Sequence, residues 1–190
     1  MAKSLFDLIA PIYGWFFQFQ VRNYRRRVEE NLLLFKDSDK ILDIGCGTGA
    51  LASVLSEFNF GVTGIDSSAE MIKQARRLNH DNTANFLAGS VSTLSLSKHD
   101  LVIASYVLHG LQQDQRQILY SDMKRLALKR VIIMDYNQRR GILTSIIEWL
   151  EHGDYFNFIK SAEKEMQLVF TSVQVIQTGK RAAWYVCDIM

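Results

Sequence analysis

The residues with the clearest chemical meaning form a glycine-rich stretch behind an acidic residue, Asp43-Ile-Gly45-Cys-Gly47-Thr-Gly49. Glycines let a backbone turn tightly and approach a ligand closely. A helix that begins after such a loop offers its first N–H groups to polar or anionic ligand atoms. Asp66 follows 21 positions after Gly45, where a carboxylate can accept hydrogen bonds from ribose hydroxyls. The pattern favours a nucleoside-cofactor site over a plain tight turn followed by a helix N-cap acid.

Two cofactor types compete for this stretch. The run Gly47-Thr-Gly49-Ala-Leu-Ala52 fits the glycine pattern of dinucleotide-binding proteins, which would make the chain an NAD-dependent oxidoreductase. In that register, however, Asp43 would stand near a bound pyrophosphate and repel it. Near the ammonium of an amino acid the same carboxylate would be attractive, which favours a cofactor with an amino-acid part.

A regular alternation of strand and helix patterns must position these residues. Strand patterns cover 40–44, 61–65, 85–88, 101–105 and 130–135, and helical patterns cover 50–58, 69–78, 113–128 and a broken stretch over 142–170. The last two strand-like runs, 172–177 and 182–188, are too close for a helical crossover and predict a hairpin. We therefore expect an α/β fold with a doubly wound, mostly parallel seven-stranded sheet and a reversed strand in the C-terminal hairpin. Such sheets bind ligands at the carboxyl ends of their strands.

Composition fits a single globular domain over residues 1–190. Of these residues 48% are hydrophobic and 22% are charged, and the net charge of +2 gives no global field that demands nucleic acid or an anionic membrane. The two cysteines form no CxxC pair, and no leader-like segment is recognised, so we expect a cytoplasmic protein. No cluster of His, Cys and acids has metal-ligand spacing, and no metal is expected.

Three parts can be distinguished within that domain. Residues 1–36 are aromatic and basic, and apolar side chains recur in them at steps of three or four, which predicts an amphipathic helical cover. Residues 37–135 form the predicted cofactor-binding half. Residues 136–190 contain the predicted acceptor-side helices and the terminal hairpin.

Four segments in the order of the chain resemble the motifs of class I S-adenosylmethionine-dependent methyltransferases. They are Ile41-Leu-Asp-Ile-Gly-Cys-Gly-Thr-Gly49, Gly64-Ile-Asp-Ser-Ser-Ala-Glu-Met71, His99 to Ser105 with Val107-Leu-His109, and Val131-Ile-Ile-Met-Asp135. The resemblance covers residues 40–135. It implies a Rossmann-like methyltransferase fold, S-adenosyl-L-methionine as the cofactor and S-adenosyl-L-homocysteine as the product.

The resemblance also implies roles for individual residues. Asp43 and the backbone of Gly45, Cys46 and Gly47 would hold the methionine moiety, and Asp66 would bind the ribose. Ser67 and Met71 would flank the adenine. Residues further along the chain complete the expected cofactor site: Gly89, Ser90, Val91 and Ser105. Ser90 stands where the family commonly has an aspartate, and a hydroxyl meets the adenine amino group more weakly than a carboxylate does.

Methyl transfer from a sulfonium is a direct displacement, and a general base is needed only for a hydroxyl, a carbon acid or a protonated amine. The single proline, Pro11, leaves no Asn/Asp-Pro-Pro-aromatic loop for amide or exocyclic nitrogens and no Pro-Cys nucleophile for cytosine C5. Nucleic acid is therefore disfavoured, and a small-molecule or lipid-like acceptor remains. A non-catalytic methyltransferase-fold partner subunit is a further alternative.

The candidate catalytic residues are Tyr106, His109 and Tyr13. Tyr106 and His109 follow the fourth predicted strand and should face the acceptor; His109 acts as a base or bonds loop backbone. Asp135 lines the site or caps the next loop. Residues 6–13 resemble the start of ubiquinone/menaquinone C-methyltransferases and bacterial phospholipid N-methyltransferases, which implies that Tyr13 lies near the sulfonium.

The remaining aromatic and histidine residues carry weaker expectations. Residues 13–27 could contact a membrane surface, or they form a helix packed over the sheet with a solvated basic face. The aromatic side chains expected to build the other cavity wall are Trp149, Tyr155, Phe156 and Phe158. We expect His99 on the surface and assign no role to His152.

Overall fold

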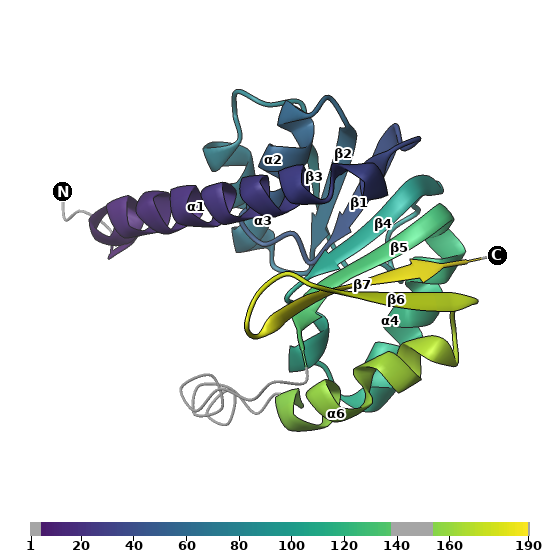
Figure 1. Cartoon of the computed structure of the whole chain (residues 1–190). Coiled ribbons are helices and arrows are strands. Elements are labelled where there is room, and N and C mark those ends of the chain that lie inside the picture. The colour runs from purple at the N-terminus through teal and green to yellow at the C-terminus, as the bar shows by residue number, and fades with distance from the viewer. Residues whose placement is uncertain (1–4, 138–153, 190) are drawn as a thin grey trace.

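A seven-stranded sheet forms the centre of the molecule, in a computed structural model that describes residues 5–137 and 154–189, with only the helix path for residues 5–15 (Figure 1). The strand order is β3-β2-β1-β4-β5-β7-β6. The strands are β1 (Lys40–Ile44), β2 (Gly61–Asp66), β3 (Asn85–Ala88), β4 (His99–Ser105), β5 (Ala127–Tyr136), β6 (Ser172–Gln177) and β7 (Ala182–Asp188). Only β7 is reversed: it is antiparallel to both neighbours, β5 and β6. The predicted fold class, including the reversed strand, is confirmed.

The helices cover both faces of the sheet. α1 (Leu5–Glu30), α2 (Ala50–Glu57) and α3 (Ala69–Leu78) lie on one face, and α4 (Gln113–Leu126) and α6 (Tyr155–Gln167) lie on the other (Figure 1). Two short 3-10 turns complete the described elements, η1 (Leu32–Phe35) and η2 (Leu108–Gly110). Among residues 5–137 and 154–189, no helix is long and apolar enough to cross a bilayer.

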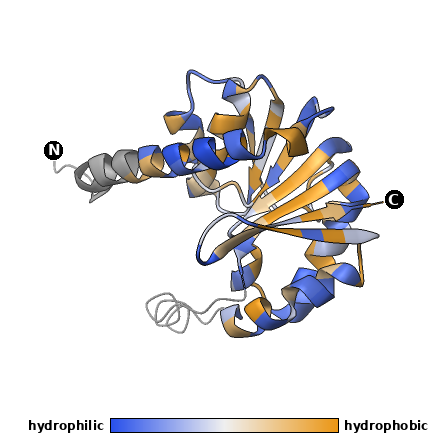
Figure 2. Cartoon of the chain, viewed as in Figure 1, coloured by the Kyte–Doolittle hydropathy of each residue, from blue (hydrophilic) through white to orange (hydrophobic). Residues whose placement is uncertain are grey.

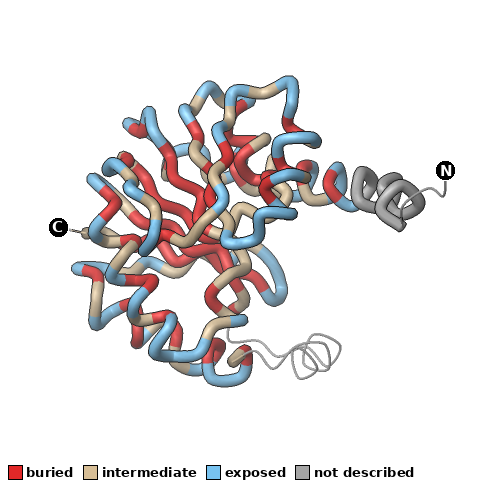
Figure 3. The backbone as a smooth tube through the Cα atoms, turned by 180° about the vertical axis from the view of Figure 1, so that it is seen from behind, coloured by how far each residue is buried: buried red, intermediate tan, exposed pale blue. Residues whose placement is uncertain are grey.

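The central strands are apolar because both of their faces are covered. Side chains alternate along β1, so that Ile41 packs against α1 and α2, while Leu42 and Ile44 pack on the side of α4 and α6. The strands are accordingly the most hydrophobic part of the ribbon and the most buried (Figures 2 and 3). An exception at this depth is Asp43, which has 1% of its surface exposed.

The predicted N-terminal helix packs over the α2 side of the sheet. Phe17, Val21 and Val28 are buried on one stripe of α1, in the core that α2 and β1 share. The helix continues to Glu30 and ends before η1. The interpretation as a helix packed over the sheet therefore holds for the described part of α1.

Two sequence expectations near β4 and β5 differ from the structure. The helix predicted over 113–128 ends at Leu126, because the next residue, Ala127, already pairs with His99 in the sheet. This pairing places His99 in β4, where the residue is 6% exposed and its Nδ1 lies 2.9 Å from the Ser97 carbonyl oxygen. The expectation of a surface His99 is wrong, and burial lowers the pKa of its imidazole.

A buried ionic network joins α4 to α6. The Arg116 guanidinium has no exposed surface and donates two hydrogen bonds of 2.8 Å to Glu165. It also donates to Asp154 at 2.8 Å and to the Leu111 carbonyl at 2.6 Å. Hydrogen bonds from Arg116 hold the pKa of the Glu165 carboxyl below its usual range despite burial. The network therefore keeps α6 in place behind β4 and β5.

We predict that Arg116→Met lowers the free energy of unfolding by about 3–5 kcal/mol, because two carboxylates lose their buried cation. Urea unfolding at pH 7 measures the change. Arg125→Met is the matched control: Arg125 pairs with Asp122 on the surface, and its loss should cost at most about 1 kcal/mol. Equal effects of the two variants would contradict the importance of the buried network.

Candidate active site

The glycine loop connects β1 to α2 at the carboxyl edge of the sheet. Gly45, Gly47 and Gly49 have φ angles of 70°, 53° and 77°, in the left-handed region that favours glycine. A Cβ on Gly45 would lie 2.5 Å from the Val107 side chain, so the loop could not pack against the turn after β4. A Cβ on Gly47 would meet nothing within 4 Å. Gly47 thus has open space beside it.

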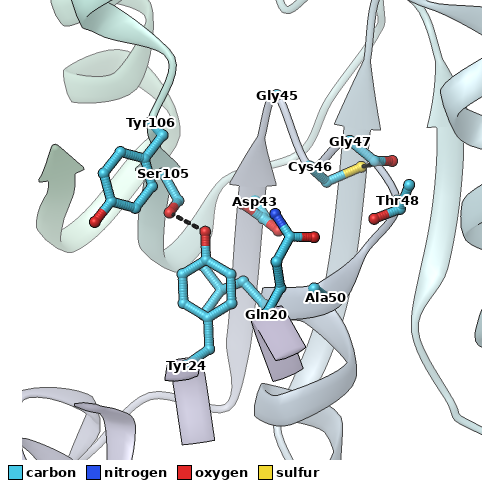
Figure 4. Close-up of a pocket in the computed structure, with 11 residues that line it drawn as sticks. Gln20, Tyr24, Asp43, Gly45, Cys46, Gly47, Thr48, Ala50, Ser105 and Tyr106 are labelled. Atoms are coloured by element: carbon cyan, nitrogen blue, oxygen red, sulfur yellow. Dashed lines mark hydrogen bonds between the residues drawn. The ribbon is translucent and has the colours of Figure 1, made fainter. Parts of the chain in front are cut away.

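A cavity of about 250 Å³ adjoins this loop beneath α1 (Figure 4). Its lining comes from α1, β1, the glycine loop, α2 and the end of β4: Gln20, Tyr24, Asp43, Gly45, Cys46, Gly47, Thr48, Ala50, Leu51, Ser105 and Tyr106. Five of the expected cofactor residues thus share one cavity. They are Asp43, Gly45, Cys46, Gly47 and Ser105.

Asp43 is the charged residue in the lining of this cavity, and its carboxylate lacks hydrogen-bond partners. Neither of its oxygens accepts a hydrogen bond within the described part of the chain. Burial, together with the nearby Asp66 charge, raises the pKa of Asp43 to about 7. A cationic ligand group in the cavity would supply the partner that the protein itself does not provide.

Asp66 connects the glycine loop to the loop that follows β2. Its Oδ2 accepts the N–H of Gly47 at 2.9 Å, and its Oδ1 accepts the N–H of Ser68 at 2.8 Å. A carboxylate has about four acceptor positions, so two bonds leave room for ligand hydroxyls. Ser68 also caps α3, since its Oγ accepts the Met71 N–H at 3.3 Å.

The other residues expected around an adenosine lie at the ends of β2 and β3, outside the lining of that cavity. Ser67 and Met71 are exposed, and the N–H of Gly89 donates to the Asp66 carbonyl at 2.9 Å. The Ser90 hydroxyl bonds Ser92 and Thr93, both at 3.0 Å. Val91 packs into the core, so a ligand at this edge would meet its backbone.

The sequence analysis predicted a helical cover over residues 1–36 but did not name the two residues that α1 adds to this cavity, Gln20 and Tyr24. The Tyr24 hydroxyl lies 2.7 Å from the Ser105 Oγ, and Gln20 stands one turn before Tyr24. Burial raises the pKa of the Tyr24 phenol, which keeps it protonated. The available signal was the spacing of Gln20, Tyr24 and Arg27, which places polar groups on one side of the helix beside its apolar stripe.

Tyr106 belongs to a second cavity of about 370 Å³, next to the first. Its φ of 55° is unusual for a residue other than glycine and places the ring between the two cavities. Its hydroxyl accepts a hydrogen bond from Arg27 Nη1 at 3.0 Å. The second cavity is lined by Phe16, Phe19, Gln20, Asn23, Tyr24, Arg27, Tyr106 and Tyr136.

His109 and Asp135 form a dyad beside this second cavity. His109 Nδ1 lies 2.8 Å from Asp135 Oδ1, and the two rings of His109 and Tyr136 meet edge to face at 4.8 Å. Asp135 is buried and also accepts the backbone N–H groups of Leu108 and Tyr136, at 3.1 Å and 2.8 Å. The carboxylate thus orients the imidazole and holds the η2 turn. The His109 ring is thus hydrogen-bonded to the side chain of Asp135.

The late aromatic residues that the structure describes do not line the second cavity. Tyr155 and Phe158 have no exposed surface and pack in the core, where Phe158 lies under the Arg116 guanidinium at 5.7 Å. Phe156 is 37% exposed. Among the described residues, α1 supplies Phe16, Phe19 and Tyr24 to the wall of the second cavity. Trp149, His152 and the Tyr13 side chain lie outside the described residues.

Comparison with known proteins identifies the type of domain. Residues 41–130, from β1 into β5, match a family described as a methyltransferase domain. This part of the chain is therefore similar to known methyltransferase domains. The glycine loop, Asp43 and Asp66 all lie inside the matched residues, and the predicted family is confirmed.

Individual relatives are distant. The ubiquinone biosynthesis O-methyltransferase of Rickettsia bellii is 28% identical over 149 residues, which cover 72% of this chain and 62% of that protein. The carboxy-S-adenosyl-L-methionine synthase of Colwellia psychrerythraea is 21% identical, over 70% of this chain and 61% of that protein. The chain thus spans about three fifths of the length of these relatives.

Solved structures share the fold. The magnesium protoporphyrin IX methyltransferase from Synechocystis PCC 6803, solved with bound S-adenosylhomocysteine (SAH), has a TM-score of 0.68 and 17% identity. The match covers 91% of this chain and 87% of that one. A protein from Pyrococcus horikoshii OT3 also reaches 0.68 at 21% identity, over 87% of this chain and 90% of that one.

We predict that Asp43→Asn stabilises the ligand-free methyltransferase domain at pH 8 by about 2–4 kcal/mol. The pKa of Asp43 is raised on folding, so the folded chain binds this proton more tightly and loses stability as pH rises from about 4 to 7. At pH 5 the carboxyl is protonated in the folded chain, and the gain should shrink there. Urea unfolding at both pH values measures it.

The control for this variant is Asp81→Asn, which removes one charge from an exposed side chain. It should leave stability nearly unchanged at both pH values. An Asp43→Asn protein that is less stable than the parent at pH 8 would show that the carboxylate has a partner in the folded chain.

Proposed function

We propose that this chain transfers a methyl group from S-adenosylmethionine to a hydroxyl of a small aromatic acceptor by direct displacement. The observation that carries the cofactor half is the buried, unpartnered Asp43 carboxylate at the glycine loop. The observation that carries the acceptor half is the dyad of His109 and Asp135 beside an aromatic cavity. The names of several relatives, O-methyltransferases of ubiquinone biosynthesis, agree with a hydroxyl acceptor.

The donors and acceptors present fit S-adenosylmethionine. Asp43 takes the ammonium of the methionine part. The open space beside Gly47 leaves room for the methionine part next to the loop backbone. Asp66 takes the ribose hydroxyls with its remaining lone pairs. Ser67, Met71 and the edge of Gly89 to Val91 surround the adenine. When bound, the cofactor supplies a methyl group activated by a positively charged sulfur.

The dyad removes the proton that an attacking hydroxyl must lose. Because an ionised carboxylate only accepts hydrogen bonds, Asp135 keeps the proton of His109 on Nδ1, and Nε2 acts as the base. The acceptor oxygen forms its bond to the methyl carbon, the carbon–sulfur bond breaks with its electron pair moving to sulfur, and the hydroxyl proton passes to Nε2. Asp135 then stabilises the imidazolium.

Peripheral membrane contact through residues 13–27 stays a prediction. Phe16 and Phe19 are half-exposed on α1, which would suit an apolar surface. Arg25 and Arg26 are paired with Glu57 and Glu30, which weakens the attraction of this face for anionic lipids. The balance favours a small aromatic acceptor over a lipid bilayer as the ligand of this region.

We predict micromolar-range binding of SAH and no binding of NADH in calorimetric titrations. Asp66→Ala should weaken SAH binding by roughly thirtyfold or more, since two ribose hydroxyls lose a charged acceptor. SAH affinity should also fall as pH drops below about 7, because protonated Asp43 no longer attracts the ammonium. Unchanged affinity in Asp66→Ala would remove the ribose assignment, and NADH binding would favour an oxidoreductase.

We predict that His109→Gln lowers kcat with a phenolic acceptor by roughly a hundredfold or more while the Kd of SAH stays the same. Methyl transfer from labelled S-adenosylmethionine measures kcat. His80→Gln, at an exposed histidine just after α3, is the control and should leave kcat unchanged. A kcat of His109→Gln equal to the parent value would show that the acceptor needs no base.

A further inference from the structure

The second cavity combines aromatic walls with one cationic side chain. Five of the residues that line it are aromatic, and the charged one is Arg27. The described lining contains no carboxylate to balance that charge. An apolar acceptor would be held by the rings, but the rings alone do not account for a guanidinium in this position.

Arg27 differs from the arginines beside it on α1. Arg25 donates to Glu57 at 2.7 and 2.6 Å, and Arg26 pairs with Glu30 at 3.6 Å. Arg27 Nη1 instead donates to a neutral group, the Tyr106 hydroxyl, at 3.0 Å. Its Nε is screened from solvent and meets no acceptor among the described residues. A buried donor without an acceptor destabilises the unliganded protein, and a ligand oxygen would remove that cost.

The place of Arg27 separates it from the reacting end of the cavity. Tyr24 and Tyr106 line both cavities, whereas Arg27 lines only the second. A methyl donor in the first cavity would therefore be separated from Arg27 by these two tyrosines. The guanidinium lies between Tyr106 and the β6–β7 turn, where a Cβ on Gly179 would be 3.8 Å from Nη2. Arg27 is thus suited to hold a group of the acceptor remote from the oxygen that is methylated.

We propose that Arg27 determines acceptor specificity by binding a carboxylate on an aromatic acceptor, which rests on the proposed methyl transfer in the neighbouring cavity. A guanidinium holds a carboxylate through two parallel N–H donors, and such charge-assisted bonds are about twice as strong as neutral ones. The substrate class is therefore a hydroxylated aromatic acid. Its ring packs among the tyrosines, its carboxylate lies at Arg27, and its hydroxyl faces His109 and the methyl donor.

Binding of matched ligand pairs to the SAH-loaded protein tests this proposal. In each pair a methyl group replaces the carboxylate: protocatechuate against para-methylcatechol, and para-hydroxycinnamate against para-propenylphenol. Calorimetry should show that at least one acid binds about tenfold or more tightly than its methyl analogue. Turnover is not needed for this measurement.

The variants identify the residue responsible. Arg27→Met should abolish the preference for the acid and leave the Kd of SAH unchanged, whereas Arg27→Lys should keep part of the preference because the charge remains. Arg26→Met is the matched control: it removes the same charge one position earlier, from an exposed side chain, and should keep the full preference.

Each other outcome has a definite meaning. Equal affinity for acid and analogue, absence of binding by both acids, or a preference that survives Arg27→Met overturns the proposal. A protein that binds SAH and prefers acids but transfers no methyl group contradicts the proposed function and leaves the carboxylate site intact. A protein that transfers methyl groups to the neutral phenols alone supports the function and overturns the role of Arg27.

Discussion

A buried negative charge without a partner is the constraint on which the rest of this structure depends. Asp43 stands on the central strand β1 with 1% of its surface exposed and no hydrogen bond to either oxygen in the described chain. Such a group is tolerated only if the surrounding fold is stable enough to hold it. The apolar strands on both sides of β1 and the helix layers over both faces supply that stability. The chain thus holds a buried acid whose two oxygens have no partner among the described residues.

The Arg116 network shows the opposite arrangement of buried charge. Its cation is satisfied by Glu165, Asp154 and a backbone carbonyl, and no ligand is needed. It lies on the α4 and α6 face of the sheet. The described residues therefore include an ionic cluster whose groups are paired and, at Asp43, a buried carboxylate that is not. The two groups differ in their hydrogen bonds: the Arg116 guanidinium has partners within the protein, and the Asp43 carboxylate has none among the described residues.

Sequence patterns predicted the features that depend on local order. The glycines at alternate positions, Asp66 at the end of β2 and the alternating apolar runs all follow from rules that act within one element or one βα unit. The bond between Tyr24 and Ser105 joins residues 81 positions apart, and no periodicity reports a contact between two distant elements. For the same reason the sequence did not show that Tyr155 and Phe158 pack in the core while Phe16 and Phe19 of α1 line the second cavity. The burial of His99 depends on its pairing with Ala127 and is likewise a property of the sheet.

The two cavities have a common partition, formed by Gln20, Tyr24 and Tyr106. Two ligands that contact these side chains from opposite sides would compete for their rotamers and hydrogen bonds. Their binding free energies would then be coupled, and by thermodynamic linkage each ligand would alter the affinity of the other by the same factor. Three shared side chains are enough for such coupling, with no movement of one domain against another.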